Sequence, residues 1–526
     1  MFDRNSLISK LEEQSDWDVI IVGGGATGLG IALDSATRGF KTLLLEQIDF
    51  AKGTSSRSTK LIHGGVRYLA QGNIDLVKEA LFERGLLLKN ASHLAKNQSF
   101  IIPNYRWWDG IFYTIGLKVY DFLAGRLSLG KSVHITKKET TSRLKTIRKE
   151  KLKGGVVYHD GQFDDARLAV NIAQSAIENG ATVLNHVKVK QLLKDSNGTV
   201  NGVTAEDTET STTYNLNAKV VINATGVFTD DILKMDNSEA KDKIRPSQGI
   251  HLVLDQSFLP GTDALMIPKT DDGRVLFLVP WHNRVIVGTT DTLLDSHSLE
   301  PKPLDSEIDF IISTANNYLT KEVHKEDVLS IYAGLRPLAA PKDKSEKTKE
   351  ISRSHKIIVS ESGLITITGG KWTTYRRMAQ DTLNKAIVLG KLPNKPCKTK
   401  NLRIHGATND VDLSNHLYIY GTDQKFIEQL IIENPKLAEK LHPRLEFIKA
   451  EVVWAIRNEM ARTIEDILAR RVRILFLDAK AAIEIAPTIG AILAEELNKT
   501  KDWQQQQISD FSKIANQYVI KITNEI

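Results

Sequence analysis

The segment VIIVGGGATGLG (residues 19–30), followed by KTLLLE (residues 41–46), decides the fold of this chain. The apolar residues that open the first segment end at three glycines, which predicts a buried parallel strand entering a tight turn. Gly23, Gly25 and Gly28 form the pattern GxGxxG. The first glycine permits the turn, the second lets the backbone approach a pyrophosphate, and the third lets the next helix pack on the strand.

The second segment strengthens this interpretation. Residues 41–45 predict another strand, and Glu46 ends it eighteen residues after Gly28. That spacing is close to the ~20 residues expected for an acid that accepts hydrogen bonds from a ribose hydroxyl. The N-terminus of the intervening helix would face the phosphates. Together the strand, helix and acid favour a dinucleotide site over the alternative, a glycine-rich turn in another kind of α/β unit.

Composition limits the class of protein. A chain of 526 residues is too long to fold around one hydrophobic core, so we expect two or three domains. Its composition, with 41% hydrophobic and 25% charged residues, is typical of a globular protein. We expect neither a membrane-spanning helix nor secretion. One cysteine, Cys397, excludes an intrachain disulfide and a cysteine-cluster metal site. The net charge of +6 favours an anionic partner, but no dense basic block predicts nucleic-acid binding.

The segment TSSRSTKLIHGGVRYL (residues 54–69) is the next informative stretch. Its serines and glycines can bring backbone N–H groups against a second ligand surface, and Lys60, His63 and Arg67 add polar or cationic side chains there. The alternative is an ordinary surface loop.

This segment, following the GGGxxG turn, resembles the FAD-dependent glycerol-3-phosphate dehydrogenases. The resemblance is good over residues 17–380 and weaker in the tail. It implies FAD as cofactor and the oxidation of sn-glycerol 3-phosphate to dihydroxyacetone phosphate. The positions that it implies for FAD binding are Gly23, Gly24, Gly25, Gly28, Glu46, Thr54, Ser55, Ser56, Lys60, Leu61, His63, Gly64, Gly65, Val187, Ala224, Gly226, Gly370, Lys371 and Thr373.

The pattern along the chain predicts the domain organisation. Residues 17–390 form a doubly wound, Rossmann-like α/β core, to which residues 363–379 return as a strand, a Gly-Gly turn and a helix. Short alternating strands predict an antiparallel β-sheet substrate cap inserted at about residues 244–354, as the resemblance also implies. Residues 391–399 are a predicted linker, and residues 391–526 a C-terminal α-helical cap domain.

Local patterns predict individual elements. We expect an amphipathic helix over residues 72–95, a helix from Phe163 to Asn179, a strand over residues 181–189 and a surface hairpin over residues 194–213. In the tail, Thr463 and Asp466 form a possible capping box that divides the helical run into two helices.

The resemblance implies a substrate site at the cap. A dianionic phosphate requires cationic groups, and arginine suits it because its guanidinium can bind two oxygens at once. By resemblance the clamp uses Arg67, Arg336, Arg353 and Lys371, and Tyr68 can hydrogen-bond the substrate. The alternative for each base is a surface salt bridge, and for Tyr68 it is core packing.

Oxidation of a secondary alcohol also needs a group that takes the hydroxyl proton. His63, in the flavin-contacting loop, and His251, on a cap strand, are the two candidates, since neutral imidazole suits this task near neutral pH. The sequence favours His63 narrowly. Arg336 could stabilise a developing alkoxide.

The segment RWWDGIFYTIGLKVYDFL (residues 106–123) is unusually aromatic. It is either core or an interfacial anchor, because tryptophan and tyrosine suit the membrane–water boundary. With no iron–sulfur ligands, electrons must pass to a diffusible acceptor, for which we expect a membrane quinone. We therefore expect a cytoplasmic protein attached to the inner face of the cell membrane, with a homodimer left open.

Three alternatives remain from the sequence. A glycerol-3-phosphate oxidase would pass the electrons to oxygen, although such oxidases often carry a cap insertion that this chain lacks. A non-catalytic flavin-binding protein of the membrane surface would not need Arg336, Lys371 and His63. An amino-acid oxidase of similar architecture needs one carboxylate-binding arginine and no basic cluster.

Overall fold

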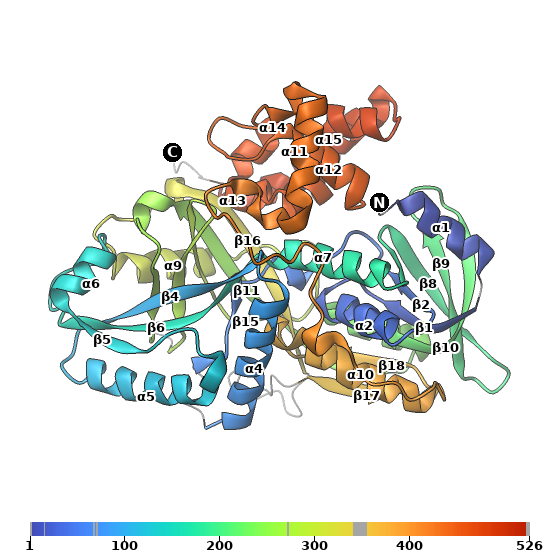
Figure 1. The fold of residues 1–526 in the computed structure, drawn as a ribbon, viewed down its shortest axis with the longest axis horizontal. Coiled ribbons are helices and arrows are strands. Elements are labelled where there is room, and N and C mark those ends of the chain that lie inside the picture. Colours follow the sequence, from blue (N-terminus) through green and yellow to red (C-terminus); the bar gives the residue numbers. More distant parts are fainter. Residues whose placement is uncertain are drawn as a thin grey trace.

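The computed structural model describes residues 3–14, 16–66, 69, 72–270, 273–339 and 355–521. Two β-sheets lie side by side, and a group of helices from the C-terminal part of the chain sits above the junction between them (Figure 1). Among the described residues, none of the helices combines the length and the apolar composition that a bilayer span requires.

The first sheet is the predicted dinucleotide-binding sheet. Strand β1 (Asp16–Val22) pairs in parallel with β2 (Thr42–Leu45) and with β10 (Thr213–Asn223). Strands β7 (Thr182–Leu184) and β18 (Ile365–Thr368) extend it in parallel on either side, and β17 (Lys356–Val359) closes one edge. Helices α2 (Ala26–Thr37), α7 (Asp165–Glu178) and α10 (Tyr375–Leu389) pack together over it. The stretches at its centre, residues 19–22, 43–45 and 220–222, are apolar and buried, as is typical of parallel strands covered by helices. The predicted Rossmann-like fold is confirmed.

The strand predicted over residues 181–189 is divided. His186 has φ +54°, so the chain turns between β7 and β8 (Val187–Lys194). Strand β8 then pairs antiparallel with β9 (Val200–Asp207), which pairs antiparallel with the first half of β10. The predicted hairpin is therefore present.

The second sheet draws on two distant parts of the chain. Strands β11 (Ile244–Asp255), β12 (Ala264–Ile267), β13 (Leu276–Trp281), β14 (Arg284–Gly288), β15 (Thr292–Leu293) and β16 (Val328–Ala339) come from the predicted cap region. Strands β3 (Leu61–Ile62), β4 (Ala95–Asn104), β5 (Val133–Thr136) and β6 (Gly154–Phe163) come from residues 61–163. Pairing of β4 with β12 joins the two parts in parallel. The predicted cap sheet of residues 244–354 was therefore incomplete, because strands from residues 61–163 belong to the same sheet. The sheet contains both parallel and antiparallel pairs and is not purely antiparallel.

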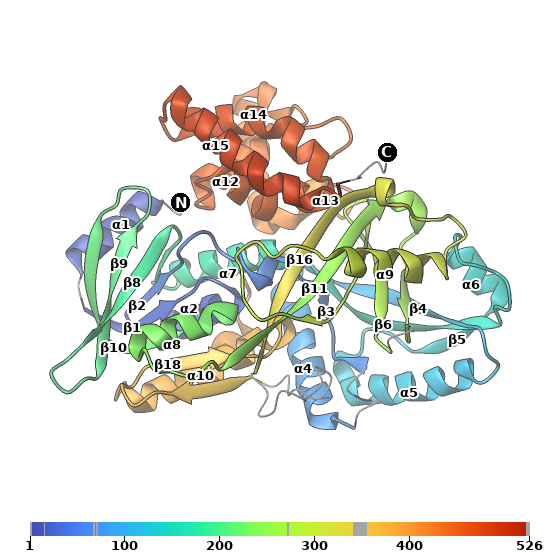
Figure 2. The same ribbon diagram turned by 180° about the vertical axis from the view of Figure 1, so that it is seen from behind.

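Two helices lie along the outer side of this second sheet. Helix α4 (Ile74–Asn90) is shorter than predicted, and α5 (Asp109–Ala124) follows the aromatic pair Trp107 and Trp108. The two helices contact each other and lie at the same end of the molecule (Figures 1 and 2). Helix α5 buries Leu117 and Tyr120, and its exposed apolar side chains are Ile111, Phe112, Ile115, Val119 and Phe122.

The C-terminal region is helical, as predicted. Its longer helices are α11 (Gln424–Glu433), α12 (Lys449–Asn458), α14 (Ala479–Glu496) and α15 (Lys501–Ala515), with the short α13 (Ile474–Leu477) between them. Met460 has φ +53° and follows the end of α12. Thr463 Oγ1 accepts from the Asp466 N–H (3.1 Å), and Asp466 Oδ2 accepts from the Thr463 N–H (3.0 Å). The predicted capping box and division into two helices are confirmed.

Buried ion pairs hold the C-terminal helices on the rest of the molecule. Asp49, on the loop after β2, accepts from Arg470 and Arg471, and Asp49 and both arginines are almost completely buried. Arg167 of α7 pairs with Glu459 through both carboxylate oxygens (2.6 and 2.8 Å). Removing one partner of such a pair would leave an uncompensated buried charge, so the docking is specific.

Candidate functional site

The glycine-rich turn lines a cavity of about 420 Å³ at the carboxyl ends of β1 and β2. Gly23 has φ +109°, and a Cβ on Gly28 would lie only 1.9 Å from the Gly23 carbonyl oxygen. A Cβ on Gly25 would meet only Ser55 Oγ, at 3.2 Å, so the space above this glycine is open. These are the three properties that a GxGxxG turn needs to hold a pyrophosphate at the N-terminus of α2.

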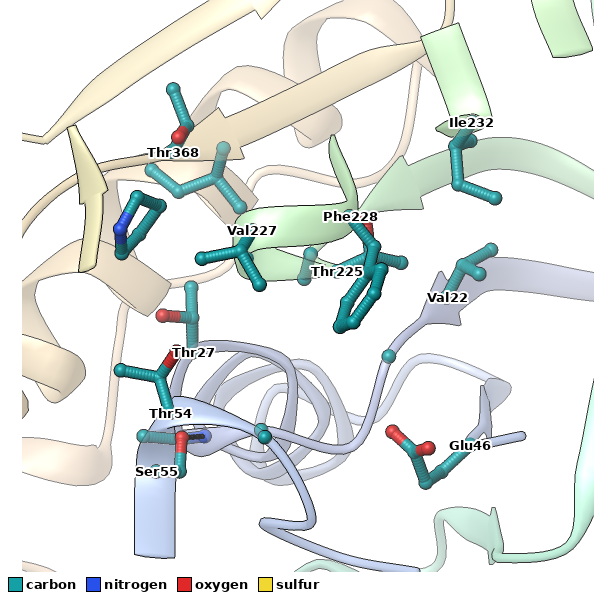
Figure 3. Close-up of a pocket in the computed structure, with 18 of the residues that line it drawn as sticks. Val22, Thr27, Glu46, Thr54, Ser55, Thr225, Val227, Phe228, Ile232 and Thr368 are labelled. Atoms are coloured by element: carbon teal, nitrogen blue, oxygen red, sulfur yellow. Dashed lines mark hydrogen bonds between the residues drawn. The ribbon is translucent and has the colours of Figure 1, made fainter. Parts of the chain in front are cut away.

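Glu46 lies at one side of this cavity, and Thr54 and Ser55 lie at the other (Figure 3). The Glu46 carboxylate accepts from the backbone N–H groups of Gly24 (2.7 Å) and Ile48 (3.0 Å). Burial raises the pKa of this carboxyl, while the two N–H groups oppose the shift. Glu46 therefore stabilises the turn through these hydrogen bonds. Its contact with a ribose stays a prediction.

The opposite end of the cavity is built by hydrogen bonds between distant segments. Ser55 Oγ accepts from the Ala26 N–H (3.0 Å), and the Ser55 carbonyl accepts from Trp372 Nε1 (2.8 Å). After β18, Gly369 and Gly370 have φ +76° and +77°, which favours glycine at both positions. The turn that they make lines the cavity together with Lys371.

A second cavity, of about 330 Å³, adjoins the first. The residues that line both are Thr54, Pro337, Gly369, Gly370, Lys371 and Trp372. The polar and charged residues that line the second cavity include His63, Asp160, His251, Arg274, Arg336 and Lys371. Its apolar lining residues belong to one buried cluster or pack against it, and they are Leu61, Val66, Phe100, Tyr158, Met266, Val275 and Phe277. A ligand at the shared wall would therefore touch a substrate in the second cavity.

Arg336 reaches the second cavity from β16. Its Nη2 donates to Thr289 Oγ1 (3.0 Å) and to the Thr290 carbonyl (3.1 Å), and Nη1 lies 3.5 Å from Asp291 Oδ1. The side chain is 27% exposed. These contacts fix the direction of the guanidinium while it lines the cavity, an arrangement that suits an anionic ligand.

His251 is held firmly on β11. It is 3% exposed, its Nε2 lies 2.8 Å from Thr59 Oγ1, and its ring stacks on Tyr332 with 4.8 Å between centroids. Burial, and then the charges of Lys60 and Arg336, hold the pKa of this imidazole well below its usual value. The ring is therefore neutral at physiological pH, the form that can accept a proton.

His63 approaches the second cavity from the loop after β3. Its backbone N–H donates to Thr373 Oγ1 (3.2 Å), and the next residue, Gly64, donates to the Tyr120 hydroxyl (2.8 Å). The side chain is half-buried at the cavity. Both histidines therefore line the second cavity, His251 from strand β11 and His63 from the loop after β3.

Several predicted site residues lie elsewhere. Among the described residues, the predicted FAD positions that line neither cavity are Gly24, Gly28, Ser56, Lys60, Gly64 and Val187. The prediction for the Lys60 side chain needs correction, because it is fully buried and pairs with Asp165 at 2.7 Å. Val187 is also fully buried, whereas its neighbours Lys188 and Val189 line the first cavity. Arg67, Tyr68 and Arg353 lie outside the described residues.

Other cavity residues were missed from the sequence. Thr59, Arg274 and Asp291 line the second cavity, and Thr289 and Thr290 hold Arg336. The only sequence signal for Thr289, Thr290 and Asp291 was the polar run TTD at the end of the strand-forming segment of residues 275–291. Such runs are common in loops, so without the sheet pairing it could not be assigned to the site.

Comparison with protein-family models agrees with this geometry. The model described as FAD dependent oxidoreductase matches residues 18–376, and the C-terminal domain of alpha-glycerophosphate oxidase matches residues 364–507. A solved glycerol-3-phosphate dehydrogenase from Bacillus halodurans, complexed with FAD, is similar with a TM-score of 0.81 at 30% identity, covering 99% of this chain and all of that one. FAD is therefore the cofactor that the first cavity and the Gly23–Gly28 turn fit.

Similar sequences carry the same family name. The probable mitochondrial glycerol-3-phosphate dehydrogenase of Caenorhabditis elegans is 41% identical, covering 96% of this chain and 74% of the relative. The mitochondrial glycerol-3-phosphate dehydrogenase of Saccharomyces cerevisiae is 38% identical, with 97% and 91% covered. The L-alpha-glycerophosphate oxidase of Mycoplasma pneumoniae shares the fold, with a TM-score of 0.55 at 18% identity. On this evidence, the chain belongs to the glycerol-3-phosphate dehydrogenase family of FAD-dependent oxidoreductases.

Proposed function

We propose that the protein oxidises sn-glycerol 3-phosphate at its secondary hydroxyl to dihydroxyacetone phosphate and passes the electrons to a membrane quinone. The observation that supports the first half is the set of side chains that line the second cavity. Arg336, Lys371 and the buried, neutral His251 all line this cavity, and Lys371 also lines the FAD cavity. When bound, FAD supplies the acceptor for the hydride.

Arg336 and Lys371 bind the phosphate in this proposal. Arg336 is pre-oriented by Thr289 and Thr290, so little side-chain freedom is lost when an anion arrives. Each charge-assisted contact contributes roughly 1.5–3 kcal/mol. Glycerol, which lacks the phosphate, would forgo both contacts.

His251 takes the hydroxyl proton. This reverses the narrow preference for His63 drawn from the sequence, and its support is the fixed ring, held by Thr59 and stacked on Tyr332. The nearby positive charges that keep His251 neutral also make it a weak base. A dianionic substrate offsets those charges, so its binding raises the basicity of His251 when the proton must move.

The test of the first half is anaerobic mixing of the FAD-loaded protein with sn-glycerol 3-phosphate. We expect the flavin absorbance to bleach and dihydroxyacetone phosphate to form in equal amount. Glycerol at the same concentration serves as the control and should bleach the flavin far more slowly. Equal rates with the two compounds would contradict the phosphate site.

The outward face of α5 supports a membrane-bound acceptor. The exposed fractions of Trp107, Phe112 and Phe122 are 73%, 69% and 83%. Further exposed apolar side chains on this segment are Trp108, Ile111, Ile115 and Val119. So many exposed apolar groups on one helix are typical of an interfacial segment, in which aromatic rings lie at the headgroup level.

Packing beneath α5 connects this face with the second cavity. Leu117 belongs to the same buried apolar cluster as Phe100, Tyr158 and Met266, and Tyr113 packs against that cluster. Those three cluster members also line the second cavity. A small polar substrate such as a three-carbon phosphate does not need these apolar lining residues, whereas the apolar ring of a lipid quinone could pack against them.

The test of the second half uses liposomes of mixed phosphatidylethanolamine and phosphatidylglycerol. Trp107, Trp108 and Phe112 are replaced by serine, which should release the protein from the vesicles without loss of FAD. The matched control replaces Val388, Leu413 and Ile432, which are 71%, 59% and 73% exposed on other elements, and should stay bound. A parent protein that ignores vesicles and is reoxidised by oxygen as fast as by a quinone analogue would be an oxidase instead.

A further inference from the structure

Lys60 lies in an unusual position directly behind the substrate cavity. It has φ +61° and its side chain is fully buried. Its Nζ donates to Asp165 Oδ2 (2.7 Å) and to the Ser56 carbonyl (2.7 Å). Burying a lysine this deeply has a large desolvation free energy, and the attraction within an ion pair does not always offset it.

Aromatic rings from three elements surround this ammonium. Its Nζ lies 5.5 Å from the centre of the Trp281 ring, 5.2 Å from that of Tyr332 and 5.3 Å from that of Phe476. Phe476 belongs to α13 of the C-terminal region, so this region completes the enclosure. Distances of this size permit cation–π attraction, which strengthens when the cation is desolvated.

A second cation shares the same carboxylate. Arg473 is fully buried, donates from Nη2 to Asp165 Oδ1 (2.9 Å) and has its guanidinium 4.5 Å from the centre of the Phe476 ring. Asp165 therefore has two cationic partners. The ion pair would survive without Lys60, so charge balance at Asp165 does not explain the lysine.

Two contacts connect Lys60 with His251. Tyr332, one wall of the ammonium's enclosure, stacks on the His251 ring. Thr59, the residue next to Lys60, contacts His251 Nε2 through its hydroxyl. We propose that Lys60 is a positioning residue that acts through His251: its fixed ammonium keeps the imidazole neutral and its backbone places Thr59 on the ring.

The electrostatics give the direction of the effect. In the interior, a fixed positive charge near His251 disfavours its protonated form. The charged and titratable groups that line the cavity with His251 or lie behind it are His63, Arg57, Tyr158, Asp160, Arg274, Asp291, Arg336, Lys371, Lys60, Tyr332, Asp165 and Arg473. Burial lowers the pKa of Lys60 to about 8, partly offset by Asp165, so its charge persists through neutral pH. The cavity cations are offset when the phosphate binds, whereas Lys60 is not reached by substrate.

The inference rests on the proposed role of His251, and its test separates the two. The rate of anaerobic flavin bleaching by saturating sn-glycerol 3-phosphate is measured from about pH 5 to about pH 9 in the FAD-loaded parent, Lys60→Met and Lys60→Arg. Removing the charge raises the pKa of His251, so the fall in rate on the acid side should begin about one pH unit higher in Lys60→Met. Lys60→Arg keeps the charge and should restore the parental profile.

Each outcome bears on one claim. If Lys60→Met lowers the rate uniformly without moving the acid side of the profile, Lys60 is merely structural and the inference is wrong. If His251→Asn bleaches as fast as the parent, His251 is not the proton acceptor, and the proposed role fails first. Should Lys60→Met not fold, Arg473→Met removes the second cation and should shift the profile in the same direction by less. Should neither variant hold FAD, the pKa of His251 is measured in the parent protein by NMR titration of its histidines. A His251 that titrates near its ordinary pKa overturns the inference.

Discussion

The two adjoining cavities are built in different ways. The FAD cavity owes its shape to backbone, namely the turn from Gly23 to Gly28 and the Gly369–Gly370 turn, with φ values that only glycine adopts readily at three of these positions. The second cavity owes its chemistry to polar and charged side chains on strands of the other sheet, such as His251 on β11 and Arg336 on β16. A cavity made of backbone recognises a shape that many ligands share, whereas one made of side chains recognises a particular charge.

The difference predicts how each cavity fails. Substitutions in the backbone-built cavity should act through sterics and abolish binding outright. Substitutions in the side-chain cavity should leave FAD in place and change the rate or the affinity for substrate by graded amounts. The following experiments could break that distinction, beginning with the largest expected effect.

Gly25→Val should abolish FAD binding. The side chain would enter the space above Gly25, where a Cβ now meets only Ser55 Oγ. We expect the Kd for FAD to rise by at least about 100-fold, or about 2.7 kcal/mol. Flavin retained after gel filtration measures the effect, and Gly116→Val, at a glycine with open space on α5, is the control. A fully flavinated Gly25→Val protein would refute the assignment of the first cavity.

His251→Asn should keep its FAD and lose rate. Removing a positioned proton acceptor lowers the rate of flavin bleaching by roughly 10²–10⁴-fold. His63→Asn is the matched comparison, because His63 lines the same cavity, and its loss should be several times smaller. Stopped-flow bleaching by sn-glycerol 3-phosphate measures both. The reverse order would return the role to His63, as the sequence alone favoured.

Arg336→Ala and Lys371→Ala should each lower kcat/KM for sn-glycerol 3-phosphate. Each loses a charge-assisted contact of roughly 1.5–3 kcal/mol, which corresponds to about 10- to 150-fold. Arg336→Lys keeps the charge but loses the forked geometry, so it should recover only part of the loss. Lys513→Ala, at an exposed pair on α15, should leave steady-state kinetics unchanged. An effect on FAD content as large as that on kcat/KM would show that the two cavities are not separable.

A cluster of three side chains remote from both cavities should have the smallest effect on FAD binding and on turnover. His405 contacts Glu178 (2.6 Å) and Asp423 (2.7 Å), and although burial opposes it, these carboxylates raise the pKa of His405 to about 9. Because the folded pKa is higher than the unfolded one, the stabilisation is complete below about pH 6.5 and is lost as pH rises through about 9. His405→Gln should therefore lower the free energy of unfolding by about 2 kcal/mol at neutral pH and by much less near pH 10. Urea titrations at the two pH values measure this, and a loss independent of pH would contradict it.

The same distinction explains what could be predicted from the sequence. The glycine turn, Glu46 and the strands beside them follow a fixed local spacing, so the fold of the FAD domain was predictable. The capping box was predictable for the same reason, because its two members, Thr463 and Asp466, are only three positions apart in the sequence. The Lys60 side chain was wrongly assigned to the ligand surface, because nothing in the local sequence indicates that it pairs with Asp165, which is distant in the chain.

The second sheet and the second cavity could not be predicted from the sequence, because they depend on pairing between distant strands. Residues 95–104 and 154–163 form β4 and β6 because they pair with each other and, through β4, with β12, which no local pattern reveals. Arg274, Asp291 and Thr59 meet at the second cavity only after that sheet has closed. Side-chain convergence of this kind depends on tertiary pairing and not on spacing.

The strand order of the first sheet determines when the FAD cavity can form during translation. Strand β1 has β10 as one neighbour, and β10 in turn has β18, which ends at Thr368. The Gly369–Gly370 turn that completes the FAD cavity follows directly. A growing chain therefore carries the glycine-rich turn from its first tens of residues, yet it cannot enclose FAD until roughly seven-tenths of the protein has left the ribosome, because long-range parallel pairing forms late. Throughout that interval β1 lacks its neighbour β10, and the sheet lacks β18. We therefore expect the nascent chain to expose apolar surface of the kind that chaperones bind.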